Sequence, residues 1–331
     1  MLKFIDRCKL QFFNFRNIDK QVLIYYNMRH GLNLEGIMKK VFISFIAATL
    51  LLCGCVRNEI NDNGKLNIVT TNFAYYDFAR AVGGEKVQIN MLIKPATNAH
   101  SYEPTPEDII NTSKSDLFIC NGGENEKWAE NIIKNAKPAN VLRVLDIIPV
   151  QDKNQHNADE HVWTSPVNAE EIVREILNKL VSVDEENKDY YINNADGYIS
   201  KLEELDNNIQ TMANNSKRNV LVFGDRFPFS HFAERYNFEC LSAFGGCAHD
   251  SEPDAKTVAM LCDKVKEEKI PVVFYIEMST DKTAKAVCEG TNAKPLMLHS
   301  CHNVSKAEFE RGETYISLMN KNLENLKEAL N

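Results

Sequence analysis

The sequence predicts an α/β protein with two lobes, each a parallel sheet flanked by helices, joined by one long backbone helix. Short apolar runs typical of buried strands alternate with helix-like patterns, as in β-α-β units. This alternation occurs twice, once before and once after residues 184–215. Residues 184–215 contain no proline and a single glycine, Gly197, which is typical of one uninterrupted helix.

The first half has the pattern of four strands and four helices. The apolar runs predict strands at residues 66–71, 87–94, 116–121 and 141–147. The intervening patterns predict helices at residues 73–82, 106–113, about 124–135 and about 167–181. The helix at 106–113 has the clearest start, because Thr105 suits the N-cap, Pro106 the first helical position and Asp108 the reciprocal capping position.

The second half repeats the pattern after the long segment. We expect strands at residues 219–223, 271–277 and 295–299, and helices at residues 228–236, 251–268, 281–289 and 309–330. Within residues 184–215, apolar side chains recur at steps of four and three, at Tyr191, Ala195, Tyr198, Leu202, Leu205, Ile209 and Met212. This single apolar seam suits a stiff helix that joins two lobes, and it equally suits a coiled coil.

The first 54 residues have the pattern of an export signal. Residues 38–54 have the three parts of a signal peptide. These are the basic start Met38-Lys39-Lys40, an apolar run from 41 to 52 and the small residues that follow. Leu52-Cys53-Gly54-Cys55 resembles a bacterial lipobox, with Cys55 as the lipidated residue; a plain secretory signal is the alternative. Residues 1–37 look like an extension that results from a start codon assigned too far upstream. We expect a protein held by lipid on the extracytoplasmic face of the cell membrane.

The remaining chain divides into a polar tether at 55–65, a first lobe at 66–182, a linking helix at 183–217 and a second lobe at 218–331. The net charge of the whole chain is −8, and it becomes more negative without the basic leader. An acidic body argues against nucleic acid as a partner. The cysteines after Cys55 include no CxxC pair, which argues against a zinc ribbon or a thioredoxin-type site.

Four residues in predicted loops carry metal-ligand chemistry: His100 and His161 in the first lobe, Glu252 and His299 in the second. His100, Glu252 and His299 each follow a predicted strand or precede a helix, where the binding crevice of an α/β sheet lies. Imidazole and carboxylate together suit zinc or manganese. Four protein ligands leave no position for a reactive water, so such a site binds metal rather than catalyses.

These residues resemble those of the cluster A-I solute-binding lipoproteins, which feed zinc or manganese to ABC importers. NAHSYEPTP is similar to the family's first ligand motif and implies His100, and DEHVWTSP is similar to the second and implies His161. SEPDAKTV resembles the segment that supplies a ligand Glu, here Glu252. Leu298-His299-Ser300 falls where the family usually has Asp-Ser, which implies His299. The resemblance implies a monomeric receptor that delivers its metal to a membrane permease.

Two departures from the family pattern affect the ligand set. The third histidine of many zinc-binding members is replaced by Gly224, and His299 stands for the final aspartate. Three imidazoles with one carboxylate favour Zn²⁺ over Mn²⁺. Whether His249 or His302 joins the site is open from the sequence.

The alternative function is a zinc hydrolase with an open metal position, although no HExxH or GxSxG string is present. A surface adhesin and a siderophore or cobalamin receptor are further alternatives.

Overall fold

The computed structural model describes residues 64–150, 159–244, 253 and 255–331. It contains two four-stranded sheets, in the strand orders β2-β1-β3-β4 and β6-β5-β7-β8, with every neighbouring pair parallel. The first sheet consists of β1 (Leu66–Thr70), β2 (Val87–Met91), β3 (Leu117–Cys120) and β4 (Val141–Arg143), and the second of β5 (Val220–Phe223), β6 (Glu239–Ser242), β7 (Val272–Tyr275) and β8 (Lys294–Met297). The predicted fold class is therefore confirmed.

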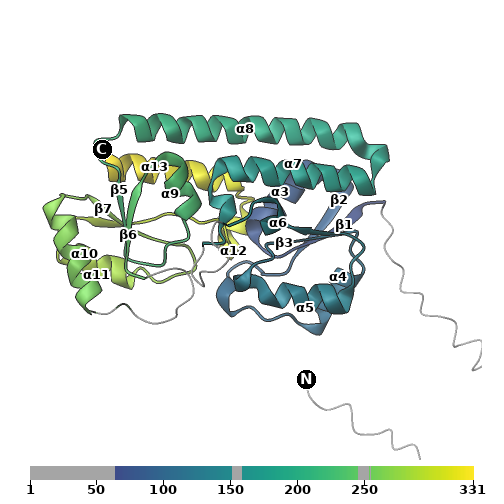
Figure 1. Ribbon diagram of the computed structural model, residues 1–331, viewed down its shortest axis with the longest axis horizontal. Helices are drawn as coiled ribbons and strands as arrows, with labels where there is room; N and C mark the ends of the chain where they lie inside the picture. Colours follow the sequence, from purple (N-terminus) through teal and green to yellow (C-terminus); the bar gives the residue numbers. More distant parts are fainter. Residues whose placement is uncertain (1–63, 151–158, 245–252, 254) are drawn as a thin grey trace, which may run out of the picture. The chain divides into compact units, whose positions relative to one another are not determined.

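Helices flank both sheets (Figure 1). The first lobe has α3 (Phe73–Gly83), α4 (Pro106–Ser113), α5 (Lys127–Ala136), α6 (Val144–Ile147) and α7 (Pro166–Val183), and the second has α9 (Ser230–Tyr236), α10 (Ala255–Glu267), α11 (Lys282–Glu289), α12 (Lys306–Glu310) and α13 (Tyr315–Leu330). The capping box of α4 forms as expected, with Thr105 and Asp108 bonded reciprocally. All residues of β3 and β5 are buried, because helices cover both faces of a parallel sheet.

The long helix α8 (Lys188–Asn215) packs against α3 and α7 of the first lobe and α13 of the second. Figure 1 shows it running beside α7 and α13. Every position of the seam predicted from the sequence is buried in this helix. Its apolar face is covered by helices of its own chain, so the seam requires no coiled-coil partner.

Three local predictions were wrong, and one strand was missed. The strand expected at 141–147 ends at Arg143, and residues 144–147 form α6. The closing helix expected at 309–330 is two helices, α12 and α13, separated around Gly312, whose φ is 73°. β6 was not predicted, and β2 ends at Met91 rather than near residue 94. The boundaries proposed for the two lobes stay a prediction.

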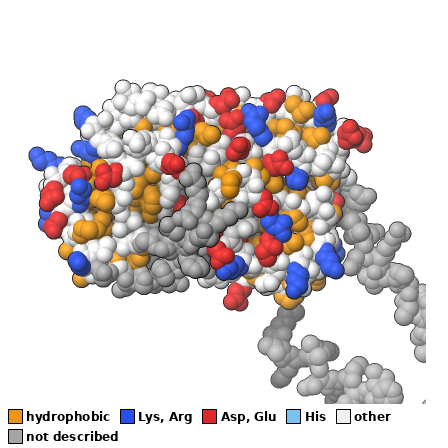
Figure 2. All heavy atoms as spheres, viewed as in Figure 1, with side chains coloured by type: hydrophobic (Ala, Val, Ile, Leu, Met, Phe, Trp, Pro, Cys, Tyr) orange, Lys and Arg blue, Asp and Glu red, His pale blue; other side chains and the backbone are white. Residues whose placement is uncertain are grey.

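In the described part of the chain, no helix combines the length and apolar character needed to cross a bilayer. The expected signal peptide, Cys55 and most of the tether lie outside the described residues. On the face shown in Figure 2, acidic and basic side chains are interspersed.

Candidate functional site

The structure describes only part of the expected ligand set. His161 and His299 are described fully, and His100 is described in its backbone alone, within the short helix η3 (Ala99–Ser101). His249 and Glu252 lie outside the described residues. The described residues contain no group of three His, Cys, Asp or Glu side chains arranged to hold a metal ion.

His161 is a buried imidazole with a fixed orientation. Its side chain is only 3% exposed, and its Nδ1 lies 2.7 Å from Oδ1 of Asp159, which also accepts the His161 backbone N–H at 3.0 Å. A carboxylate partner assigns the ring proton to Nδ1, so Nε2 is the nitrogen through which this imidazole would coordinate a metal. Asp159 thus orients the ring.

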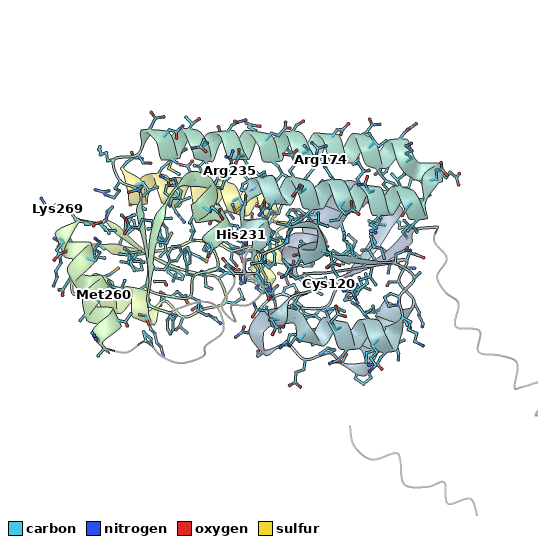
Figure 3. The ribbon with its side chains drawn as sticks, in the orientation of Figure 1. Cys120, Arg174, His231, Arg235, Met260 and Lys269 are labelled. Atoms are coloured by element: carbon cyan, nitrogen blue, oxygen red, sulfur yellow. The ribbon has the colours of Figure 1, made fainter. Side chains whose placement is uncertain are left out.

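Residues of the second lobe also bind Asp159 and fix its position. Its Oδ2 accepts the backbone N–H of Ser230 at 2.8 Å, at the start of α9, and its carbonyl oxygen lies 2.8 Å from Nε2 of His231. Figure 3 labels His231 between the two sheets. Burial raises the pKa of Asp159, but the charge of His161 and the hydrogen bonds from His161 and Ser230 outweigh it and lower the pKa below its usual value. The carboxylate form is therefore favoured beside His161.

The imidazole of His302 stands next to that of His161. Their ring centroids are 5.1 Å apart, and both rings contact Trp163, at 5.1 Å from His161 and 5.2 Å from His302. A cavity of 20 Å³ between the lobes is lined by both histidines, together with Ala99 beside His100. The structure thus brings histidines of both lobes to one cavity, and the one from the second lobe is His302.

His299 points elsewhere. Its Nδ1 accepts the backbone N–H of Cys301 at 2.9 Å, so the neutral ring carries its proton on Nε2. That Nε2 is buried, has no hydrogen-bond partner among the described atoms and lies 4.0 Å from Oε2 of Glu308. A protonated Nε2 has no lone pair to offer a metal. His299 lines neither of the two cavities that contain His161 and His302.

The backbone explains why these two histidines face different ways. Cys301 has φ of 59°, in the left-handed region that few residues with a side chain adopt. Glu277, two residues after the end of β7, accepts the backbone N–H of Ser300 at 2.8 Å and that of His302 at 3.2 Å. The Ser300 hydroxyl also donates to Glu277. Glu277 therefore supports the turn that carries His302.

The first lobe anchors the segment before His161 through Glu160. The Glu160 carboxylate accepts the backbone N–H groups of Glu124 at 2.6 Å and Asn125 at 3.0 Å. Its close approach requires Gly123, since a Cβ there would lie 2.3 Å from this carboxylate. The Glu160 carbonyl accepts a bond from the Asn121 amide at 3.1 Å. Sequence reasoning missed these supports, although Glu160 stands beside His161 in the DEHVWTSP string.

Comparison with known families gives a match over nearly the whole described body. The family model described as "Zinc-uptake complex component A periplasmic" matches residues 68–329. The high-affinity zinc uptake system protein ZnuA of Bacillus subtilis is 30% identical over 307 residues, which cover 86% of this chain and 96% of that protein. The manganese ABC transporter substrate-binding lipoprotein PsaA of Streptococcus anginosus is 26% identical, with 89% of this chain and 98% of that protein covered.

Solved structures show the same similarity. The Zn(II)-bound ZnuA-like domain of Streptococcus pneumoniae AdcA aligns with a TM-score of 0.70 and 28% identity, covering 81% of this chain and 99% of that one. The metal-dependent lipoprotein YcdH of Bacillus subtilis aligns with a TM-score of 0.72 and 31% identity, covering 81% of this chain and 100% of that one.

Proposed function

The chain belongs to the family of the periplasmic component A of the zinc-uptake complex, and we propose that it captures zinc outside the cytoplasm and passes it to the permease of an ABC importer. This family consists of metal-binding transport receptors rather than hydrolases. The observation that carries the proposal is the meeting of His161 and His302, from different lobes, at one small cavity.

We propose His100, His161, His302 and Glu252 as the ligands. His302 replaces His299 in this set because the His299 ring accepts a bond at Nδ1 and must keep its proton on Nε2. The backbone of His100 lies beside Ala99, which lines the cavity. Glu252 would add the carboxylate from the segment before α10, and His249, in the same segment, is a further candidate ligand.

Zinc is the proposed cargo, with manganese as the alternative. Imidazole is a softer donor than carboxylate, and three imidazoles with one carboxylate favour zinc over manganese. Relatives named for zinc and for manganese both occur in the comparisons. Metal binding needs unprotonated imidazoles, so the affinity should fall as the solution becomes acidic.

Titration calorimetry with zinc tests the ligand set. His161→Ala and His302→Ala should each weaken binding by more than about 100-fold, because removing a ligand costs more than removing its supporting contact. His299→Ala is the matched control, since it removes a buried imidazole three residues from His302. It should keep affinity within about tenfold of wild type. Loss of binding in His299→Ala with retention in His302→Ala would instead support the ligand implied by the sequence resemblance.

We further propose that Cys55 is lipidated and holds a monomeric receptor on the outer face of the cell membrane. Relatives named as lipoproteins support this anchor. Mass spectrometry of protein extracted from membranes should find Cys55 as the N-terminal residue with acyl chains attached through its sulfur. An N-terminal peptide with an unmodified Cys55 would contradict the anchor.

A further inference from the structure

A strained turn leads from β2 toward the segment that carries His100. The Thr97 N–H donates to the Lys94 carbonyl at 3.0 Å, with Pro95 and Ala96 between them. Ala96 has φ of 66°. Proline followed by a residue with positive φ is the pattern of a type II turn, whose third position normally takes glycine or asparagine. A Cβ at Ala96 makes this conformation unfavourable, so other contacts must hold it.

The second lobe supplies those contacts. The Asn303 side-chain amide donates to the Lys94 carbonyl at 2.9 Å and to the Thr97 carbonyl at 2.7 Å. The Ala96 N–H donates to the Val304 carbonyl at 2.7 Å. Three hydrogen bonds from two consecutive residues of one lobe therefore fix a four-residue turn of the other.

The orientation of the Asn303 amide is also determined. Its Oδ1 accepts the Val304 N–H at 2.8 Å, so the amide nitrogen must face the two carbonyls of the turn. The side chain is buried, which makes an unpaired donor or acceptor here costly. Asn303 directly follows His302, whose own carbonyl accepts the Phe73 N–H at 3.0 Å across the lobe boundary.

We infer that Asn303 is a positioning residue for cargo binding: from the second lobe it holds the turn at Lys94–Thr97 and thereby sets the place of the His100 segment relative to His302. The inference rests on the proposed function. One short stretch, residues 302–304, then carries a ligand and also fixes the approach to a ligand of the opposite lobe. Zinc release requires His100 to move away from the metal. The hydrogen bonds from Asn303 to the turn before His100 oppose that movement.

The test measures how fast zinc leaves the full chain. Zinc-loaded protein is mixed rapidly with an excess of a chromogenic chelator, and the release rate is recorded. Asn303→Ala should release zinc about tenfold faster, because two amide-to-carbonyl bonds are lost. Asn325→Ala is the matched control, since Asn325 donates one such bond to Met297 within the second lobe, at 2.8 Å. This control should release zinc at the wild-type rate.

A second substitution separates positioning from general stability. Glycine adopts a positive φ without steric strain, so Ala96→Gly should make the turn less dependent on Asn303. Added to Asn303→Ala, it should slow release again by about threefold, and alone it should leave release no faster than wild type.

Each outcome has one consequence. Wild-type release in Asn303→Ala, or faster release in Ala96→Gly alone, would overturn the positioning role. If Asn303→Ala does not fold, Ala96→Gly alone decides. A wild-type protein that binds no zinc in the same assay would reject the proposed function itself.

Discussion

Glu126 is a buried acid with one unsatisfied oxygen. Its Oε2 accepts the Asn121 N–H at 2.7 Å, whereas Oε1 is buried without a hydrogen-bond partner among the described atoms. The Thr71 hydroxyl, likewise unpaired, is near enough to affect its titration. Burial raises the pKa of Glu126 to about 7, although the Asn121 N–H and the Thr71 hydroxyl act in the opposite direction.

This raised pKa predicts how stability depends on pH. Between the ordinary pKa of 4.5 and about 7, the folded protein binds a proton that the unfolded chain releases. The contribution of Glu126 is therefore fully present below pH 4.5 and is lost as pH rises through about 7, by roughly 3 kcal/mol. Glu126→Gln cannot titrate, so its stability relative to wild type should rise between pH 5 and pH 8. Urea unfolding of metal-free protein at both values measures this, and parallel changes in the two proteins would contradict it.

At the residue scale, local motifs predicted only part of the site. The DEHVWTSP string pointed to His161, and that residue does line the cavity between the lobes. The choice between His299 and His302 depends on the left-handed backbone at Cys301 and on the bonds from Glu277. The positive φ has no signal in the sequence, because this conformation is rare at cysteine, and the backbone groups that Glu277 binds lie more than twenty residues later in the chain.

At the scale of elements, periodic patterns predicted most helices and strands. The seam of α8 was readable because a long helix repeats its apolar positions many times. Short runs carry less information: residues 141–147 are apolar enough for a strand or a helix, and periodicity cannot distinguish them. The break between α12 and α13 follows from Gly312 and from the capping box at Thr314, whose partner is Ser317 rather than the usual Glu or Gln.

Asp77 shows how the elements are tied together. This buried carboxylate on α3 accepts a bond from the Tyr198 hydroxyl of α8 at 2.9 Å and from the Tyr315 N–H at the start of α13 at 2.8 Å. The Arg80 guanidinium binds its other oxygen at 2.5 Å. One carboxylate therefore connects the first lobe, the linking helix and the last helix of the second lobe. Relative movement of these elements would leave a buried charge with fewer donors, which is costly.

At the scale of the whole described body, hydrogen bonds cross between the lobes close to the cavity. The Trp163 indole N–H donates to the Ser300 carbonyl at 2.8 Å, and the Tyr315 hydroxyl donates to the Trp163 carbonyl at 2.7 Å. Asn303 and Asp159 add the contacts described above. A hinge-type closure would have to break several of these bonds together, and α8 would have to bend. Cargo release should therefore involve movement of loops rather than rotation of lobes.

This conclusion predicts a small change in dimensions on metal binding. Solution X-ray scattering of metal-free and zinc-loaded protein should give the same radius of gyration within error, because α8, the Asp77 bonds and the contacts at Ser300 stay intact in both forms. The forward scattering from the same data should correspond to a monomer. Asn325→Ala serves as a control that leaves all of these interlobe bonds in place. A clear compaction on adding zinc would show that the lobes rotate and that these interlobe bonds break in the metal-free state.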